Sequence, residues 1–122
     1  MQFQFNSSEP IYRQIAEQIE DAIASNGFEE GTQIPSTNEI SKEFHINPAT
    51  VLKGMNIVSA KNLIEKRRGL GMFVAPGARE RILNEKRDHF FEQFVVGLVK
   101  EARNLNISEA ELLELIKRGY ER

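Results

Sequence analysis

The chain has 122 residues, of which 40% are hydrophobic and 28% are charged, and its formal net charge at pH 7 is −2, a balance typical of one small globular unit. It contains no cysteine, which excludes disulfides, thiolate zinc sites and cysteine catalysis. No apolar run approaches the ~18 to 20 residues of a membrane span, and the N-terminus lacks a basic-then-apolar signal peptide, so we expect a cytoplasmic protein without membrane contact.

The first predicted helix covers residues 10–25. Its apolar residues recur every four positions and predict a stripe that packs in the core: Ile11, Ile15, Ile19 and Ile23. Asn26 and Gly27 end this helix. Before it, Phe3-Gln4-Phe5 alternates like a short strand that packs on this unit or on a partner.

Two further helix starts follow at close spacing. Ser36 and Glu39 have the spacing of a capping box, which predicts a helix of about two turns from Thr37. Asn47 offers a second cap, and Pro48 suits the first position of the next helix. A turn of three or four residues therefore separates two short helices.

The helix from Pro48 has a core-facing stripe at spacings of four and three, made by Val51, Met55 and Val58. Gly54 lies inside this helix, where glycine costs roughly 1 kcal/mol relative to alanine, so we expect it to mark a close contact between helices. Small or polar residues at the helix start allow close approach to a duplex, and free N–H groups there bind phosphate.

A hairpin follows after Asn62. Two β-prone runs, residues 63–68 and 72–74, flank the turn Gly69-Leu70-Gly71. Three adjacent cations, Lys66, Arg67 and Arg68, lie beside its tip, where they are suited to contact phosphates or the minor groove. The alternative is a solvated strand, since charge runs usually lie on the surface.

These motifs resemble the GntR family of bacterial transcription regulators over residues 10–74: a PSxxE helix start, an NPxTV recognition-helix start and a GxGxFV wing. The short helical region after Pro76 is similar to the YtrA subfamily, in which a short C-terminal segment pairs two subunits. The resemblance implies an α+β, mainly helical fold, with a winged helix-turn-helix domain at residues 1–76 and a two-helix dimerisation segment at residues 77–122. It also implies a dimeric repressor that binds a pseudo-palindromic, double-stranded DNA operator.

The candidate DNA-facing residues come from the two helix starts and the wing. They are Ser36, Thr37, Asn38, Asn47, Pro48, Ala49, Thr50, Leu52, Lys53, Lys66, Arg67, Arg68, Gly69 and Gly71. The resemblance also exposes departures from the family pattern: Asn38 replaces an arginine that contacts DNA, Ala49 a larger polar residue, Asn62 a glycine and Leu70 a lysine. Asn38 remains suited to bond adenine, and Leu52 to pack on a thymine methyl group.

The charge distribution partly offsets the acidic total. Residues 9–43 contain eight acidic and two basic side chains, whereas residues 45–76 contain five basic side chains and one acidic side chain. The cations therefore concentrate on the predicted recognition helix and wing, as a DNA-binding surface requires.

The C-terminal part begins after Pro76-Gly77. Residues 78–89 have few apolar side chains, which predicts the exposed first turns of a long connecting helix. Residues 90–99 are then largely apolar, and Ser108 with Glu111 forms another capping box before a last amphipathic helix. The candidate dimer interface is Phe90, Phe91, Phe94, Val95, Leu98, Leu112, Leu113 and Ile116.

Two helices of about 40 residues cannot supply a stable core of their own, so we expect a homodimer. The alternative is that they fold back on the winged domain. A small-molecule effector could enter the cleft around Phe90, Phe91 and Phe94, but we favour an apolar core as the explanation of these residues.

Catalysis has no support in the sequence. His45 and His89 are 44 residues apart and have no second ligand at metal spacing, and Ser36 and Ser108 are explained as caps. We therefore expect neither enzyme activity nor a cofactor. The alternative function is a winged-helix protein-interaction module that has lost DNA binding, which the acidic residues 9–43 and the change at Asn38 favour.

Overall fold

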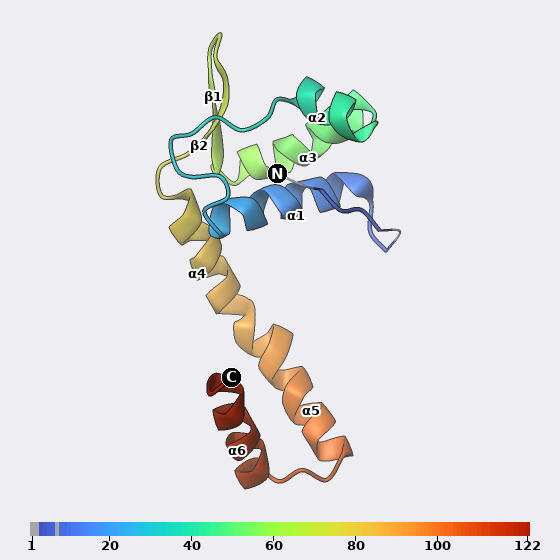
Figure 1. Cartoon of the computed structure of the whole chain (residues 1–122), viewed down its shortest axis with the longest axis vertical. Helices are drawn as coiled ribbons and strands as arrows, with labels where there is room; N and C mark the ends of the chain where they lie inside the picture. Colours follow the sequence, from blue (N-terminus) through green and yellow to red (C-terminus); the bar gives the residue numbers. More distant parts are fainter. Residues whose placement is uncertain (1–2, 7) are drawn as a thin grey trace. The chain divides into compact units, whose positions relative to one another are not determined.

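The computed structural model describes residues 3–6 and 8–122 and is mainly helical, with one small antiparallel sheet (Figure 1). Its contacts divide the chain into two compact units, Met1–Asn84 and Glu85–Arg122. The elements are α1 (Ile11–Ala24), α2 (Thr37–Phe44), α3 (Pro48–Ala60), β1 (Ile64–Arg67), β2 (Gly71–Val74), α4 (Ala78–Phe90), the π-helical segment η1 (Phe91–Val95), α5 (Val96–Asn104) and α6 (Glu109–Tyr120). The predicted α+β, mainly helical fold is confirmed.

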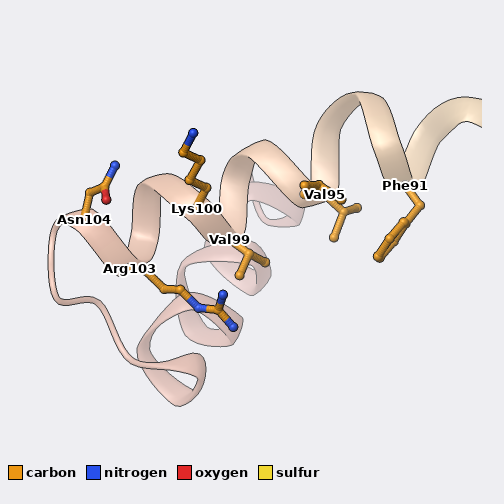
Figure 2. Close-up of a pocket in the computed structure, with 7 residues that line it drawn as sticks. Phe91, Val95, Val99, Lys100, Arg103 and Asn104 are labelled. Carbon is orange, nitrogen blue, oxygen red and sulfur yellow. The ribbon is translucent and has the colours of Figure 1, made fainter.

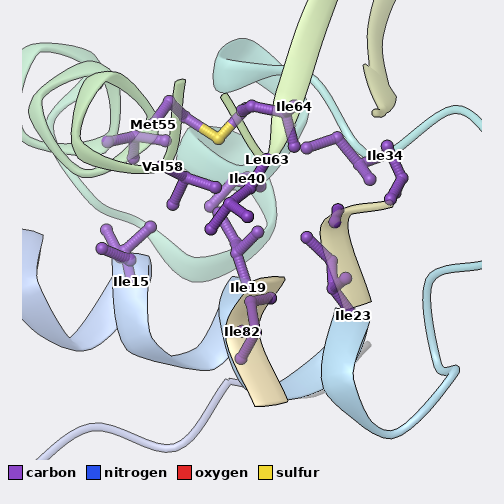
Figure 3. Close-up of a cluster of buried hydrophobic side chains, with 14 of the residues drawn as sticks. Ile15, Ile19, Ile23, Ile34, Ile40, Met55, Val58, Leu63, Ile64 and Ile82 are labelled. Carbon is purple, nitrogen blue, oxygen red and sulfur yellow. The ribbon is translucent and has the colours of Figure 1, made fainter. Parts of the chain in front are cut away.

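The first unit is built on the packing of α1 against α3. A Cβ added at Gly54 of α3 would lie 2.7 Å from the carbonyl oxygen of Tyr12 and 3.0 Å from Cβ of Ile15, so only glycine allows this approach. The predicted close contact at Gly54 is confirmed. The core beside it draws side chains from α1, α2, α3, the hairpin, the start of α4 and the segment before α2 (Figure 3). They include Ile15, Ile19, Ile23, Ile34, Ile40, Val51, Met55, Val58, Leu63, Ile64, Val74 and Ile82.

The predicted stripe on α1 is correct for three of its four isoleucines. Ile15, Ile19 and Ile23 are buried, but Ile11 is 42% exposed. A spacing of four residues drifts about 40° around an α-helix at each step, so the first isoleucine has turned away from the centre of the buried face. Ala16 is buried beside Ile15.

The hairpin pairs β1 with β2, with Ile64 opposite Val74 and Arg67 opposite Gly71. A third segment that sequence reasoning missed joins β2 from its other side. Gln33 bridges to Phe73, the N–H of Ile34 donates to the Met72 carbonyl, and the N–H of Val74 donates to the Thr32 carbonyl. The wing is therefore anchored to the chain that precedes α2.

The N-terminal residues pack as an extended segment without forming a strand. Phe3 is buried, and its ring meets Phe44 of α2 edge to face at a centroid distance of 4.9 Å. The backbone of Gln4 exchanges hydrogen bonds with the side-chain amide of Gln18 on α1. Residues 3–5 therefore pack on the first unit. They are held by the Gln18 side chain and the Phe44 ring, and not by hydrogen bonds to a neighbouring strand.

The start of α4 differs from the sequence prediction. Ala78 and Ile82 were expected on exposed turns of a connecting helix, but both are buried in the core of the first unit. One apolar residue per helical turn is enough to cover the edge of a small core. The low apolar content of residues 78–89 therefore did not reveal that Ala78 and Ile82 are buried. The contacts consequently divide the chain within α4, between Asn84 and Glu85.

The second unit consists of the rest of α4, η1, α5 and α6. The backbone stays helical through η1, because Phe90 and Val96 at its ends both have right-handed helical angles. Ser108 caps α6 by accepting from the N–H of Glu111. The predicted capping box forms differently in its second half, since the Glu111 carboxylate accepts from the Ser108 hydroxyl.

Candidate nucleic-acid interface

The starts of α2 and α3 present backbone N–H groups at the surface. Ser36 and Glu39 form the predicted capping box, in which each accepts from the backbone N–H of the other. The Asn47 side chain accepts from the N–H of Ala49, and Pro48 occupies the first turn of α3 as predicted. Thr50 is half-buried, whereas Asn47, Pro48 and Ala49 are exposed, so this helix start is open to an anionic partner.

One surface depression of about 410 Å³ joins α2, α3 and the wing. Six of the predicted DNA-facing residues line it: Ser36, Thr37, Asn38, Leu52, Lys66 and Gly71. These come from positions up to 35 residues apart, and the fold brings them to one place. Leu52 is 49% exposed there, so an apolar contact surface lies among polar groups.

The same depression includes residues that sequence reasoning missed. Asn56 and Ser59 of α3 and Met72 of β2 line it together with Met55. Asn56 lies one turn after Leu52 on the same flank of α3, and that i, i+4 spacing was the signal that could have found it.

The wing divides its three cations. Lys66 lines the depression, whereas the Arg67 guanidinium lies over the Phe73 ring, 4.1 Å from its centroid, and 3.6 Å from the Glu65 carboxylate. Arg68 follows β1 in the exposed turn. Only part of the predicted cationic run therefore faces the recognition elements.

The wing tip is braced by hydrogen bonding and by glycine geometry. The Gln33 side-chain amide donates to the Leu70 carbonyl. Gly69 and Gly71 have φ angles of 76° and 121°, which favour glycine, and a Cβ at Gly71 would meet the Gln33 amide at 2.6 Å. The Leu70 side chain at the tip is 64% exposed.

Lys53 lies away from the depression. Its ammonium is 3.9 Å from the centroid of the Tyr12 ring on α1, a cation–π contact. Because Lys53 follows Leu52 by one residue, it is rotated by about 100° around α3. This lysine therefore flanks the start of α3 on the α1 side.

The second unit exposes the apolar side chains predicted at a dimer interface. Phe90, Phe91 and Phe94 are 56%, 60% and 56% exposed. Val95 and Leu112 are half-buried, and Leu98, Leu113 and Ile116 are exposed. Phe91 and Val95 border a groove of about 490 Å³ along α5, where entry of an effector stays a prediction (Figure 2).

Residues 3–6 and 8–122 contain no cluster of three or more histidine, aspartate or glutamate side chains suited to hold a metal ion. No helix among them is long and apolar enough to cross a membrane.

Two short helices at a tight turn, with a β-hairpin beside the second, define a winged helix-turn-helix protein. The chain matches the model of the bacterial regulatory proteins, gntR family, over residues 11–74. It belongs to this family of transcription regulators.

Three comparisons place the chain within the family. It is 34% identical to the uncharacterized HTH-type transcriptional regulator YhcF of Bacillus subtilis, over 96% of this chain and 95% of YhcF. It is 29% identical to the HTH-type transcriptional repressor YtrA of Bacillus subtilis, over 91% of this chain and 85% of YtrA, which confirms the predicted resemblance to the YtrA subfamily. The crystal structure of the AraR DNA-binding domain in complex with operator ORE1 aligns with a TM-score of 0.53 at 27% identity, covering 62% of this chain and 94% of that one.

Proposed function

We propose that this transcription regulator acts in the cytoplasm as a homodimer that binds a pseudo-palindromic DNA operator and represses transcription by occupying it. The observation that carries the proposal is the depression shared by α2, α3 and the wing, where Asn38, Leu52 and Lys66 meet. A polar amide, an exposed apolar group and a cation at one helix-bounded surface match the mixture of base edges, thymine methyl groups and phosphates in a duplex.

Each part of the surface has a role in this proposal. The exposed start of α3 enters the major groove, because Ala49 and Thr50 are small enough to permit close approach. Asn38 bonds an adenine edge, and Leu52 packs on a thymine methyl group. Lys66 and Arg68 contact phosphates and set the position of the domain without reading sequence.

The proposed dimer is inferred from the apolar surface of the second unit. Its residues 85–122 expose large apolar side chains, and a segment of that size rarely keeps a core of its own. A dimer covers this surface and presents two recognition helices to two half-sites. Similarity to YtrA, which is named as a repressor, supports repression over activation. Similarity to the AraR DNA-binding domain, whose structure contains an operator, supports operator binding.

The test is selection from a random duplex pool, followed by titration of the selected duplex at several salt concentrations. We expect an inverted repeat bound by two subunits with nanomolar affinity, and a logarithmic salt slope that steepens by about 0.9 for each phosphate contacted. Absence of any enriched sequence, with binding lost at physiological salt, would contradict operator recognition.

A winged-helix protein-interaction module is the second candidate. Asn38 in place of an arginine and the excess of acidic residues at positions 9–43 favour it. The triple substitution K66A/R67A/R68A separates the two functions. A DNA regulator loses most of its strong duplex affinity, whereas an interaction module has no strong duplex affinity to lose.

A further inference from the structure

Two apolar grooves lie on the second unit, one along η1 and α5 and the other at the start of α6. The α5 groove, of about 490 Å³, has an apolar wall formed by Phe91, Val95, Val96 and Val99. The α6 groove, of about 480 Å³, has an apolar wall formed by Ile107, Ala110 and Leu115. The two grooves are nearly equal in size, and both lie on helix faces that keep large apolar side chains exposed.

The grooves carry opposite charges. The polar residues that line the α5 groove are Lys100, Arg103 and Asn104, without a carboxylate. Figure 2 shows Arg103 continuing the row of Phe91, Val95 and Val99, with Lys100 on the other flank.

The charged residues that line the α6 groove are Glu111 and Glu114, without a cation. The two grooves are therefore similar in size and opposite in charge.

The chain's own contacts leave these charges available. Across residues 85–122, all of which the structure describes, no salt bridge involves Lys100, Arg103 or Glu111, although the Glu111 carboxylate accepts a hydrogen bond from the Ser108 hydroxyl. Glu114 pairs with Lys117 at 3.7 Å, but both side chains are 72% exposed, so this pair contributes little. The loop between α5 and α6 is tied down by the N–H of Ile107, which donates to the Ala102 carbonyl. In this arrangement α6 turns back from α5 without filling the α5 groove.

We propose that the α5 face bearing the first groove packs against the α6 face bearing the second groove in another copy of the chain, and that two-fold symmetry repeats this contact. The inference rests on the proposed dimer and specifies its interface. Lys100 and Arg103 pair across it with Glu111 and Glu114 of the second copy, around a centre formed by the apolar walls. A two-fold axis makes both contacts equivalent. The two cations and the two carboxylates of each subunit therefore all face opposite charges on the other subunit.

The charges also fix the direction of the helices. Lys100 and Arg103 lie in the C-terminal half of α5, and Glu111 and Glu114 lie in the N-terminal half of α6. An antiparallel pair brings these halves together. A parallel pair would instead place the α5 cations beside the basic last turn of α6, where like charges repel.

The test uses two charge-reversed variants of the full chain, K100E/R103E and E111K/E114K. Each variant alone sets like charges against each other in both contacts of its homodimer, so we expect dimerisation to weaken by about tenfold or more. An equimolar mixture restores attraction in both contacts, because the reversed α5 of one variant meets the reversed α6 of the other. Sedimentation velocity should therefore detect a heterodimer with nearly the affinity of the original dimer.

The control is E101K/E121K, which makes the same charge change as E111K/E114K at exposed positions outside both grooves. We expect it to leave dimerisation within about threefold of the original. Circular dichroism of each variant alone reports its folding, and recovery on mixing uses the same chains, so misfolding cannot imitate it.

Two results would overturn the interface. Charge-reversed variants that dimerise as tightly as the original chain would place the contact elsewhere and leave the proposed dimer intact. Weakened variants that fail to recover on mixing would show that Lys100 and Arg103 do not face Glu111 and Glu114 across the dimer. A monomeric original chain would instead overturn the proposed dimer itself.

Discussion

Lys66 and Arg67 are neighbours in β1, yet their side chains lie on opposite faces of the wing. Lys66, opposite Met72, lines the depression with α2 and α3. Arg67 lies over the Phe73 ring and beside Glu65. The alternation of a β-strand therefore assigns two adjacent cations to different surroundings.

The first prediction concerns these two residues. We expect Lys66→Ala to weaken duplex binding several-fold and to reduce the logarithmic salt slope by about 0.9, because one phosphate contact is lost. We expect Arg67→Ala to change both quantities less, since its guanidinium is already engaged on the other face. Fluorescence anisotropy titrations of both variants on one duplex, at several salt concentrations, measure the difference. Equal losses would contradict the division of the wing.

Much of the first unit was predictable because its signals are local. The caps at Ser36 and Asn47 act over two or three residues, and the stripe of Val51, Met55 and Val58 reports one helix face. Such features depend little on distant parts of the chain. Pairing of residues 32–34 with β2 was missed because it joins segments about 40 residues apart, which short-range patterns do not encode.

The sequence predicted which elements form the candidate site, but it predicted less well which way their side chains point. The helix starts and the wing were located from capping and turn residues. Whether Lys53 faces the depression or Tyr12 depends on the rotation of α3 against α1, which the contact at Gly54 fixes. Asn56 was omitted although its i, i+4 spacing from Leu52 places the two on the same flank of α3.

The second prediction tests the contact between α1 and α3. Gly54→Ala places a methyl group 2.7 Å from the Tyr12 carbonyl oxygen, so the helices must separate. We expect a net destabilisation of about 1–3 kcal/mol, although alanine is the better helix former. Thermal unfolding should show a fall in Tm of several degrees.

The matched control is Gly119→Ala near the end of α6, where nothing lies within 4 Å of the added Cβ. There we expect an unchanged or slightly higher Tm, because only helix propensity acts. If both substitutions gave the same shift, the close approach at Gly54 would not be the cause of the effect.

The third prediction concerns Asn62, which precedes the wing where the family usually has glycine. Its φ angle is 60°, a left-handed conformation that asparagine tolerates better than most residues. We expect Asn62→Ala to cost about 1–2 kcal/mol and Asn62→Gly to cost nothing. Urea unfolding compares the three proteins. The Arg81 side chain bonds the backbone carbonyl of residue 62, so both substitutions keep that contact.

The last prediction concerns the acidic face of α1. Glu17 is exposed, and its partial desolvation raises its pKa above the ordinary value; the neighbouring Glu9, Asp21 and Glu20 raise it further. A carboxyl whose pKa is higher in the folded state favours folding below its unfolded pKa, and that contribution is lost as the pH rises through the folded pKa. We therefore expect Glu17→Gln to raise Tm at pH 7 and to change it little near pH 4. Glu43→Gln removes the same charge from an exposed position on α2, and an equal rise in Tm at pH 7 there would assign the effect to net charge alone.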